Sequence, residues 1–218
     1  MSTEMQSIQE RIKAELANVR KSVAPPASNR ISLQGRKFTL PNGTTDNGPM
    51  TAVVLDHRNF NRYYTKPYDP QNPVPPQCFA IAKQFEDLSP ENHDNVEDPQ
   101  ASACSECPMN QFGSAPNGKG KACRNIVRLA IVAPDATTDT QPMTLEVPPS
   151  ALKHWNRFVN DLETVGLIPA QVTVDISFDD SVAYPCPTFH AREAHDDIET
   201  FWTLRDKAQS MLDQPPAT

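Results

Sequence analysis

The sequence predicts a mainly β fold with flanking α-helices, and three observations support this prediction. Residues 51–65 and 126–133 are rich in the β-branched, aliphatic and aromatic side chains that strands favour. Residues 171–178 alternate apolar and polar side chains, as a strand with one buried face does. The 218 residues include 22 prolines but only 7 glycines, which indicates many rigid turns between short elements.

The N-terminal part of the chain is predicted to contain one helix and three extended segments. Residues 7–23 carry apolar side chains at helical spacing and stop before two consecutive prolines, which predicts a short amphipathic helix. Packing on the core and binding of a partner are both open for this helix. The extended segments are residues 31–33, 37–40 and 51–65, and a proline-rich connector follows at residues 67–76.

The C-terminal half is predicted to contain four strands and two helices. The strands are expected at residues 126–133, 143–147, 171–178 and 184–190. The first helix opens at Pro148, Pro149 and Ser150, presents a row of apolar side chains on one face and ends at Gly166. The final helix is expected at about residues 193–212.

This order of elements matches a five-stranded barrel of the OB type, which places its single helix between the third and fourth strands. The predicted divisions are an N-terminal helix and linker at residues 1–28, an OB-like domain at residues 29–191, and a C-terminal helix with a short tail at residues 192–218. An insert at about residues 74–125 interrupts the OB-like domain.

Four cysteines of this insert are spaced as ligands for one metal ion. Cys104 and Cys107 form a knuckle that can point two thiolates at one ion, and Cys78 and Cys123 flank it. Four protein sulfurs leave no position for water, so a zinc ion here would be structural. The insert is polar and weakly periodic, and a zinc ion would supply the organisation that apolar burial does not.

Two alternatives stay open at this predicted zinc site. The same four thiolates could hold iron, although nothing else in the sequence indicates electron transfer. His93 lies in the same insert and could replace Cys78 as a ligand. The fifth cysteine, Cys186, is expected to pack within a strand.

Two segments combine the cations and aromatic side chains that single-stranded nucleic acids bind. The first is a run on the long strand: Arg58, Phe60, Arg62, Tyr63, Tyr64 and Lys66. Strand alternation places most of this run on one face, where bases could stack and phosphates could be neutralised. The second is a glycine-containing basic arm: Lys119, Lys121, Arg124 and Arg128. The alternative for both segments is that they do not bind nucleic acid: the aromatic residues would pack in the core of a sheet, and the cations would be solvated.

Composition and motifs limit the cellular site and the kind of activity. The N-terminus lacks the apolar stretch of a signal peptide, and no segment is apolar enough to cross a membrane. Five clustered cysteines fit a reducing compartment, so a cytoplasmic protein is expected. Residues 118–121 lack the spacing of a nucleotide-hydrolase loop, and no acid/base or nucleophile constellation is visible. We therefore expect a protein without enzymatic activity.

The cysteine motifs carry a family resemblance. The run from Cys104 to Ser114, Cys-x-x-Cys-Pro-Met-Asn-Gln-Phe-Gly-Ser, and the run Gly-Lys-Gly-Lys-Ala-Cys-Arg-Asn resemble single-stranded DNA-binding proteins of tailed bacteriophages. The resemblance covers about residues 53–189 and extends to residues 75–81 and 148–153. It implies an OB-like barrel with a zinc insert that coats single-stranded DNA in the cytoplasm of an infected cell, together with phage replication or recombination proteins.

The leading prediction is a non-enzymatic protein that binds single-stranded DNA without sequence preference in replication or recombination. The rival is a zinc-braced adaptor that binds a replication or host protein through an acidic loop and the terminal helices. That loop, residues 84–118, contains seven acidic residues and no lysine or arginine. The formal net charge of −7 also counts against phosphate binding, since phosphate contacts need cations at the contact surface.

Overall fold

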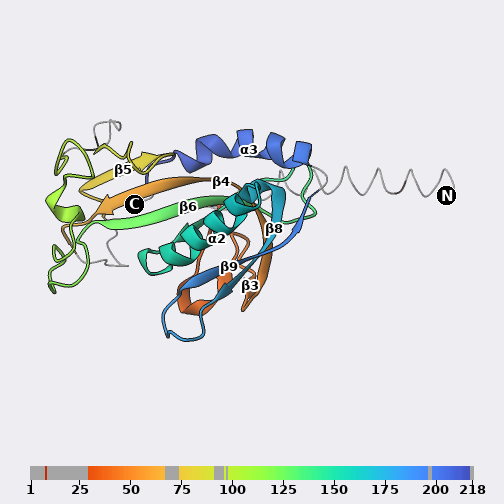
Figure 1. The fold of residues 1–218 in the computed structure, drawn as a ribbon, viewed down its shortest axis with the longest axis horizontal. Helices are drawn as coiled ribbons and strands as arrows, with labels where there is room; N and C mark the ends of the chain where they lie inside the picture. The colour runs from red at the N-terminus through yellow and green to blue at the C-terminus, as the bar shows by residue number, and fades with distance from the viewer. Residues whose placement is uncertain are drawn as a thin grey trace.

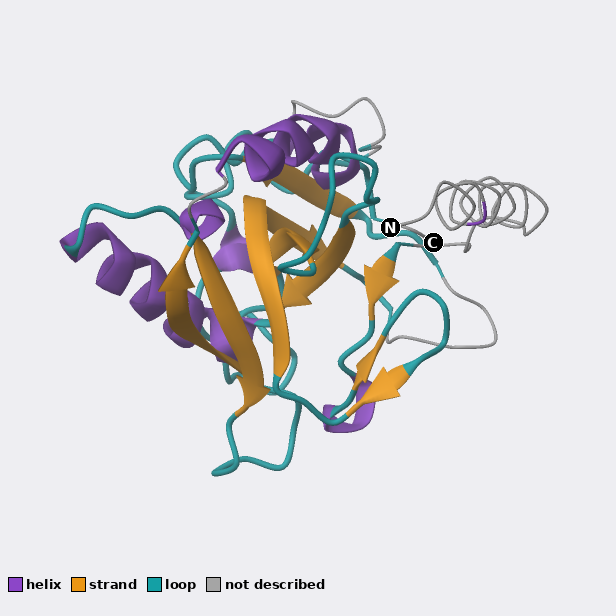
Figure 2. Cartoon of the chain, turned by 90° about the vertical axis from the view of Figure 1, so that its right-hand side faces the viewer, coloured by secondary structure: helices purple, strands orange, loops and turns teal. Residues whose placement is uncertain are grey.

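A seven-stranded β-sheet forms the centre of the protein, with one long helix on each face (Figures 1 and 2). The computed structural model describes residues 29–66, 74–90, 98–195 and 198–216, together with Ile8 and Val96. The helix predicted at residues 7–23 and the possible ligand His93 lie outside these ranges. Within the described part of the chain, no helix has both the length and the apolar composition that crossing a bilayer requires.

The strands follow one another in the order β1-β7-β6-β4-β8-β9, and β5 also pairs with β4. Their bounds are β1 Arg30–Ile31, β4 Met50–Tyr63, β5 Cys78–Ala82, β6 Arg124–Val132, β7 Met143–Val147, β8 Val172–Phe178 and β9 Pro187–Ala194. The long strand β4 organises the sheet, because β6 pairs along one side of it while β8 and β5 share the other side. All of these pairings are antiparallel except β1 with β7.

The prediction of a mainly β fold with flanking helices is confirmed, but the predicted closed barrel is not found. Among the described residues, β9 pairs only with β8, and the free side of β7 is occupied by β1. A barrel would require β7 and β9 to pair, and β1 takes the hydrogen-bonding edge of β7 that such closure would use. The sheet is therefore open.

The two faces of the sheet bury different helices because side chains alternate along each strand. On one face Val54, Leu129 and Ile131 pack against helix α2, Leu152–Thr164, through its Trp155 and Phe158. The opposite face contacts helix α3, Ile198–Leu212: Val53, Leu55, Ala130 and Val132 pack against Phe201, Leu204, Ala208 and Leu212. Each large side chain buried in this way contributes about 1.5–3 kcal/mol.

The residues on either side of helix α2 set its two ends. Pro149–Ala151 form a 3-10 turn, and α2 follows directly at Leu152. At the other end Gly166 has a φ of 72°, and the amides of Gly166 and Leu167 donate to the carbonyls of Glu163 and Leu162. This pairing satisfies the last carbonyls of the helix and needs a left-handed residue, which glycine adopts without strain.

Three predicted elements have different bounds in the structure: one strand is shifted, and the final helix and the segment at residues 37–40 are shorter. The strand expected at residues 184–190 begins at Pro187, because residues 179–186 form the β8–β9 hairpin. The final helix begins at Ile198, since β9 continues to Ala194. The segment at residues 37–40 yields β2, Phe38–Thr39, which pairs with β3, Thr45–Asp46, in a separate ribbon. The Phe38 ring stacks on Phe178 at 4.6 Å and joins this ribbon to the core.

Candidate functional site

A cavity of about 590 Å³ opens at the β1 edge of the sheet. Three arginines line it: Arg30 from β1, Arg62 near the end of β4 and Arg124 at the start of β6. The other walls come from residues 31–34, from the turn at residues 148–150 that leads into α2, and from the β8–β9 hairpin. The cavity therefore gathers cations from three strands that are distant in sequence.

Glu146 on β7 is the acidic residue that lines this cavity. Its carboxylate oxygens lie 3.0 Å from Arg30 Nη2, 3.0 Å from Arg62 Nη2 and 3.6 Å from Arg128 Nη2. Burial raises the pKa of Glu146, but the charges of Arg62, Arg30 and Arg128 outweigh burial and hold the pKa below its ordinary value. The carboxylate is thus ionised at neutral pH. Its single negative charge is smaller than the combined positive charge of the arginines around it.

The predicted base-stacking residue Phe60 lies in the core. It is fully buried, and it packs with Phe79, Ile81 and Ile126 while the Arg128 guanidinium lies 4.4 Å above its ring. The reason is that β4 has a neighbour on each side here: Ile81 of β5 and Ile126 of β6 lie directly opposite Phe60 and flank its ring. Phe60 has no exposed ring face on which a base could stack, so for this residue the alternative of packing in the sheet core is the correct one.

Two of the predicted phosphate-binding arginines are bound to helix α3 instead. Arg58 donates from Nε to Asp213 at 2.7 Å and from Nη2 to Gln209 at 2.5 Å. Arg128 is buried and donates from Nη1 to the carbonyls of Leu212 at 3.2 Å and Gln214 at 2.5 Å. These bonds tie the last turn of α3, and the residues Asp213 and Gln214 that follow it, to the sheet, with cations near the helix C-terminus. Neither guanidinium is free to contact DNA.

Arg58 belongs to a buried ionic cluster around Asp56. The Asp56 carboxylate accepts hydrogen bonds from Lys83 and, at 3.0 Å, from Gln209, and it lies 3.5 Å from Arg205. Burial raises the pKa of Asp56, but the Lys83 and Gln209 hydrogen bonds outweigh burial and hold the pKa well below its usual range. This cluster joins β4 to α3 and is structural.

The other predicted contact residues are accessible to different degrees. Tyr63, Tyr64 and Lys121 are half-buried, and Lys66, Lys119 and Arg124 are exposed. Of all the predicted nucleic-acid-binding residues, only Arg62 and Arg124 line the cavity of about 590 Å³, which we call the arginine cavity.

The basic arm forms a compact loop that exposes an aromatic ring. The Gly113 amide donates to the Gly120 carbonyl at 2.7 Å, and both glycines have positive φ, at 92° and 80°. Phe112 is 85% exposed, and Lys121 Nζ lies 5.4 Å from the centre of its ring. The loop therefore presents a cation beside an exposed ring, the combination that the sequence predicted for the buried Phe60.

The four predicted metal ligands gather around one small cavity. Cys78, Cys104, Cys107 and Cys123 are all buried and together line a space of about 10 Å³, room for about one water-sized sphere. They come from the start of β5, from the loop before the 3-10 turn Pro108–Asn110, and from the residue before β6. The amide of Cys104 donates to the Leu88 carbonyl at 3.1 Å, and that of Cys123 to the Met109 carbonyl at 2.8 Å.

Hydrogen bonds from asparagine side chains order the backbone around these four cysteines. Asn110 is buried, donates to the Cys104 carbonyl at 2.7 Å and accepts from Asn125 at 2.9 Å. Asn125 also donates to Asn61 at 2.6 Å. Burial raises the pKa of Cys104, and the neighbouring Asn61 side chain opposes part of this rise. The buried Nδ2 of Asn61 makes no hydrogen bond within the hydrogen-bond limits. An amide that favours the thiolate is the kind of outer contact that metal-bound sulfur receives.

Thiolates are a residue type that zinc prefers, but the four sulfurs are spread more widely in this structure than zinc coordination requires. No three of these sulfurs all lie within 4.8 Å of one another, whereas tetrahedral thiolates on zinc are about 3.8 Å apart. Burial, and then the charges of Cys104, Cys107 and Cys78, raise the pKa of Cys123 to about 12. Four thiolates are therefore unfavourable here without a cation between them, and a divalent ion would reverse this repulsion.

Several residues of the site were not predicted from the sequence. A signal exists for Glu146, because a lone carboxylate in the apolar strand Met143–Val147 must find a cationic partner when buried. No signal marks Arg30, whose two-residue strand is too short to be recognised. The exposed rings of Phe112 and Tyr184 lie on loops, where the sequence alone does not separate exposed from buried aromatics.

Comparisons of this chain with protein-family models, with curated proteins and with solved structures found no match. The resemblance of the cysteine motifs to phage single-stranded DNA-binding proteins therefore stays a prediction, and function has to be argued from the site itself.

Proposed function

We propose that this protein binds single-stranded DNA without reading its sequence and has no enzymatic activity. The observation that carries the proposal is the cavity of about 590 Å³ lined by Arg30, Arg62 and Arg124. Guanidinium groups bind phosphate in a bidentate manner, and a groove of cations can follow a DNA backbone whatever its bases are. In a chain with a net charge of −7, this concentration of arginine is a local exception.

The strand order supports an OB-like origin for the site. If β4, β6, β7, β8 and β9 are taken as strands one to five of an OB-type barrel, their order in the sheet is three-two-one-four-five, as in that fold. Helix α2 then lies between strands three and four, where the OB type has its helix. In such folds oligonucleotides bind over strands two and three, between the loop joining strands one and two and the loop joining strands four and five. The arginine cavity is lined by β6 and β7 and by Pro185 of the β8–β9 hairpin, which is the equivalent place.

Exposed aromatic rings supply the stacking that the proposal requires. Phe112 on the basic arm is 85% exposed, and Tyr184, next to the cavity residue Pro185, is 53% exposed. In the OB assignment these rings lie on the two loops that flank the binding face. Each stacked base is worth about 1–3 kcal/mol without sequence preference.

The proposal includes one structural zinc ion held by Cys78, Cys104, Cys107 and Cys123. Bound zinc would supply a cross-link among three segments of the insert. The insert carries few apolar residues, and the asparagine network around Asn110 orders only part of it. In this way the cysteines would fix Lys119 and Lys121 relative to Arg124, which directly follows Cys123.

Fluorescence anisotropy with labelled oligo-dT and a matched duplex, at two salt concentrations, tests the proposal on zinc-loaded protein. We expect tighter binding to the single strand, with an affinity that falls as salt rises because counterions are released. Equal affinity for the duplex would contradict the preference for single strands. No binding of either DNA at low salt would overturn the proposal and favour the adaptor, whose acidic loop and terminal helices would then be the contact surfaces.

A further inference from the structure

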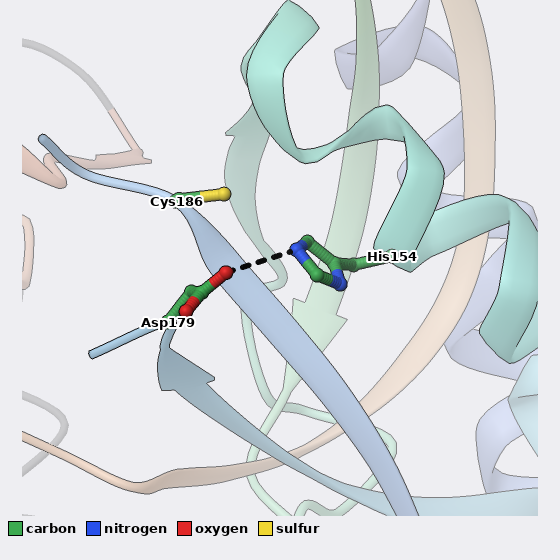
Figure 3. Close-up of side chains that lie close together, drawn as sticks. All are labelled: His154, Asp179 and Cys186. Carbon is green, nitrogen blue, oxygen red and sulfur yellow. Dashed lines mark ion pairs between the residues drawn. The ribbon is translucent and has the colours of Figure 1, made fainter. Parts of the chain in front are cut away.

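Three metal-ligating side chains converge at the start of α2, outside the cysteine insert. Nε2 of His154 lies 3.5 Å from Oδ2 of Asp179, and Sγ of Cys186 completes the group (Figure 3). The three ligand atoms all lie within 4.8 Å of one another. Among the described residues, no other group of three or more histidine, cysteine, aspartate or glutamate side chains is this close.

The β8–β9 hairpin holds two of these side chains next to each other. The Asp179 amide donates to the Cys186 carbonyl at 2.9 Å, so the hairpin closes at these two residues. Oδ1 of Asp179 accepts hydrogen bonds from the amide of Ser181 at 2.9 Å and from its hydroxyl at 2.6 Å. These bonds orient the carboxylate and leave Oδ2 directed at His154, as outer contacts do for metal-ligating carboxylates.

Nε2 of His154 is buried and makes no hydrogen bond. Its contact with Asp179 has the distance of an ion pair but not the geometry of a hydrogen bond. Leaving a buried polar atom unsatisfied destabilises the folded state. The position of His154 is therefore explained best by a ligand that comes from outside the chain.

We propose that His154, Asp179 and Cys186 bind a divalent transition-metal ion, for which zinc suits this mixture of nitrogen, oxygen and sulfur ligands. Zinc bonds of about 2.0–2.3 Å place tetrahedral ligand atoms about 3.3–3.8 Å apart. The separation of 3.5 Å between His154 and Asp179 already lies in this range. The separations to Cys186 are at most 4.8 Å, so they must shorten by about 1 Å or less.

This second site differs from the four-cysteine site in having an open position. Three protein ligands leave a tetrahedral zinc ion one place for water or a small ligand. A cavity of about 370 Å³ lies beside His154 and Asp179 and gives such a ligand room. Its wall also holds the ion pair of Arg157 with Asp161.

The same three residue types can also activate a cysteine nucleophile, but Cys186 does not fit that role. Its thiol is buried and donates to the Ser150 carbonyl at 3.6 Å. Burial raises the pKa of Cys186, whereas a nucleophilic cysteine needs a lowered pKa and access to its substrate. A coordinated metal ion would displace the thiol proton directly.

The test is the number of zinc ions per chain after equilibrium dialysis against micromolar free zinc, measured by plasma emission spectrometry. We expect two ions in the wild type and one in Asp179→Asn, which keeps the Oδ1 acceptor for Ser181 and so preserves the loop. The matched control is Asp180→Asn, with the same change of charge at the next residue, which pairs with Arg36 instead. This control should keep two ions.

The outcomes separate this site from the four-cysteine site. One ion in both the wild type and Asp179→Asn would overturn the second site and leave the first intact. One ion in the wild type and none in Asp179→Asn would support the second site and overturn the first. In a second measurement, cobalt added to protein whose first site holds zinc should give a thiolate charge-transfer band that Cys186→Ser abolishes. Persistence of that band in Cys186→Ser would exclude Cys186 as a ligand.

Discussion

Arg62 Nη2 lies 3.0 Å from Oε2 of Glu146, although the strands β4 and β7 that carry them are separated by β6. The Arg62 side chain is only 13% exposed, and the same carboxylate oxygen also contacts Arg30. A phosphate that entered the cavity would therefore compete with Glu146 for these guanidinium groups. In the proposed complex, Glu146 would hold the arginines in place before DNA arrives and would limit how tightly DNA binds.

Replacing Glu146 with Gln should lower the free energy of unfolding by about 3 kcal/mol, because buried Arg128 loses its carboxylate. The folded-state pKa of Glu146 is depressed below the ordinary 4.5, so its contribution is complete above pH 4.5 and is lost as pH falls through the folded-state pKa. Urea unfolding of both proteins across this pH window measures the effect. A difference between the two that stays constant down to pH 2 would contradict the assignment.

Replacing Arg124 with Ala should weaken binding of oligo-dT and reduce the salt dependence. The expected change in the slope of log affinity against log salt is about 0.7 for one lost phosphate contact on a single strand. Arg157→Ala is the matched control, since Arg157 is an exposed arginine of α2 that does not line the arginine cavity. Equal slopes for the two variants would remove Arg124 from the proposed interface.

Two phenylalanines should respond in opposite ways to replacement by alanine. Phe60→Ala should cost about 3–5 kcal/mol of stability, because it empties part of a packed core, and should leave the affinity of the folded fraction unchanged. Phe112→Ala should leave stability unchanged within about 0.5 kcal/mol and weaken DNA binding by about 1–3 kcal/mol. Thermal unfolding and anisotropy on the same samples separate the two effects. A stable Phe60→Ala protein with weakened binding would return Phe60 to the interface.

The elements that the sequence predicted well are those whose apolar pattern is long. Helix α2, with Trp155, Phe158 and Leu162 on one face, and β8, with alternating Val172, Val174 and Ile176, both agree with their patterns. Long patterns are reliable because each residue adds to the same burial preference. The open sheet was not predicted, because it depends on the two-residue strand β1, which has too few side chains to form a pattern.

The predictions for the candidate site were limited by partners that lie far away in sequence. Arg58 and Arg128 were predicted to bind phosphate because the sequence does not reveal that α3 packs on the face of the sheet that carries these two arginines. Phe60 read as a stacking residue because the pairing of β5 with β4 is a long-range contact. The cysteines gave a clear prediction because metal chemistry restricts both their type and their spacing, whatever the fold.

If the four cysteines hold zinc as proposed, removal of the ion should loosen the insert and leave the rest of the sheet intact. With the ion chelated, the hydrogen bonds from the Cys104 amide to Leu88 and from the Cys123 amide to Met109 lose the cross-link that supports them. Hydrogen exchange by mass spectrometry should then rise across residues 101–123 and stay unchanged in β7 and in the middle of β6. Such local opening is expected where few apolar contacts hold a segment.

Cys107→Ser should reproduce the effect of chelation without a chelator, and Ser105→Ala, an exposed change in the same knuckle, should behave as the wild type. DNA affinity should fall together with protection of the insert, since Phe112, Lys119 and Lys121 lie between Met109 and Cys123. If exchange in the insert rises while oligo-dT affinity stays unchanged, the zinc site would be structural but separate from DNA binding. If chelation and Cys107→Ser leave exchange unchanged, the four cysteines would not hold a metal ion.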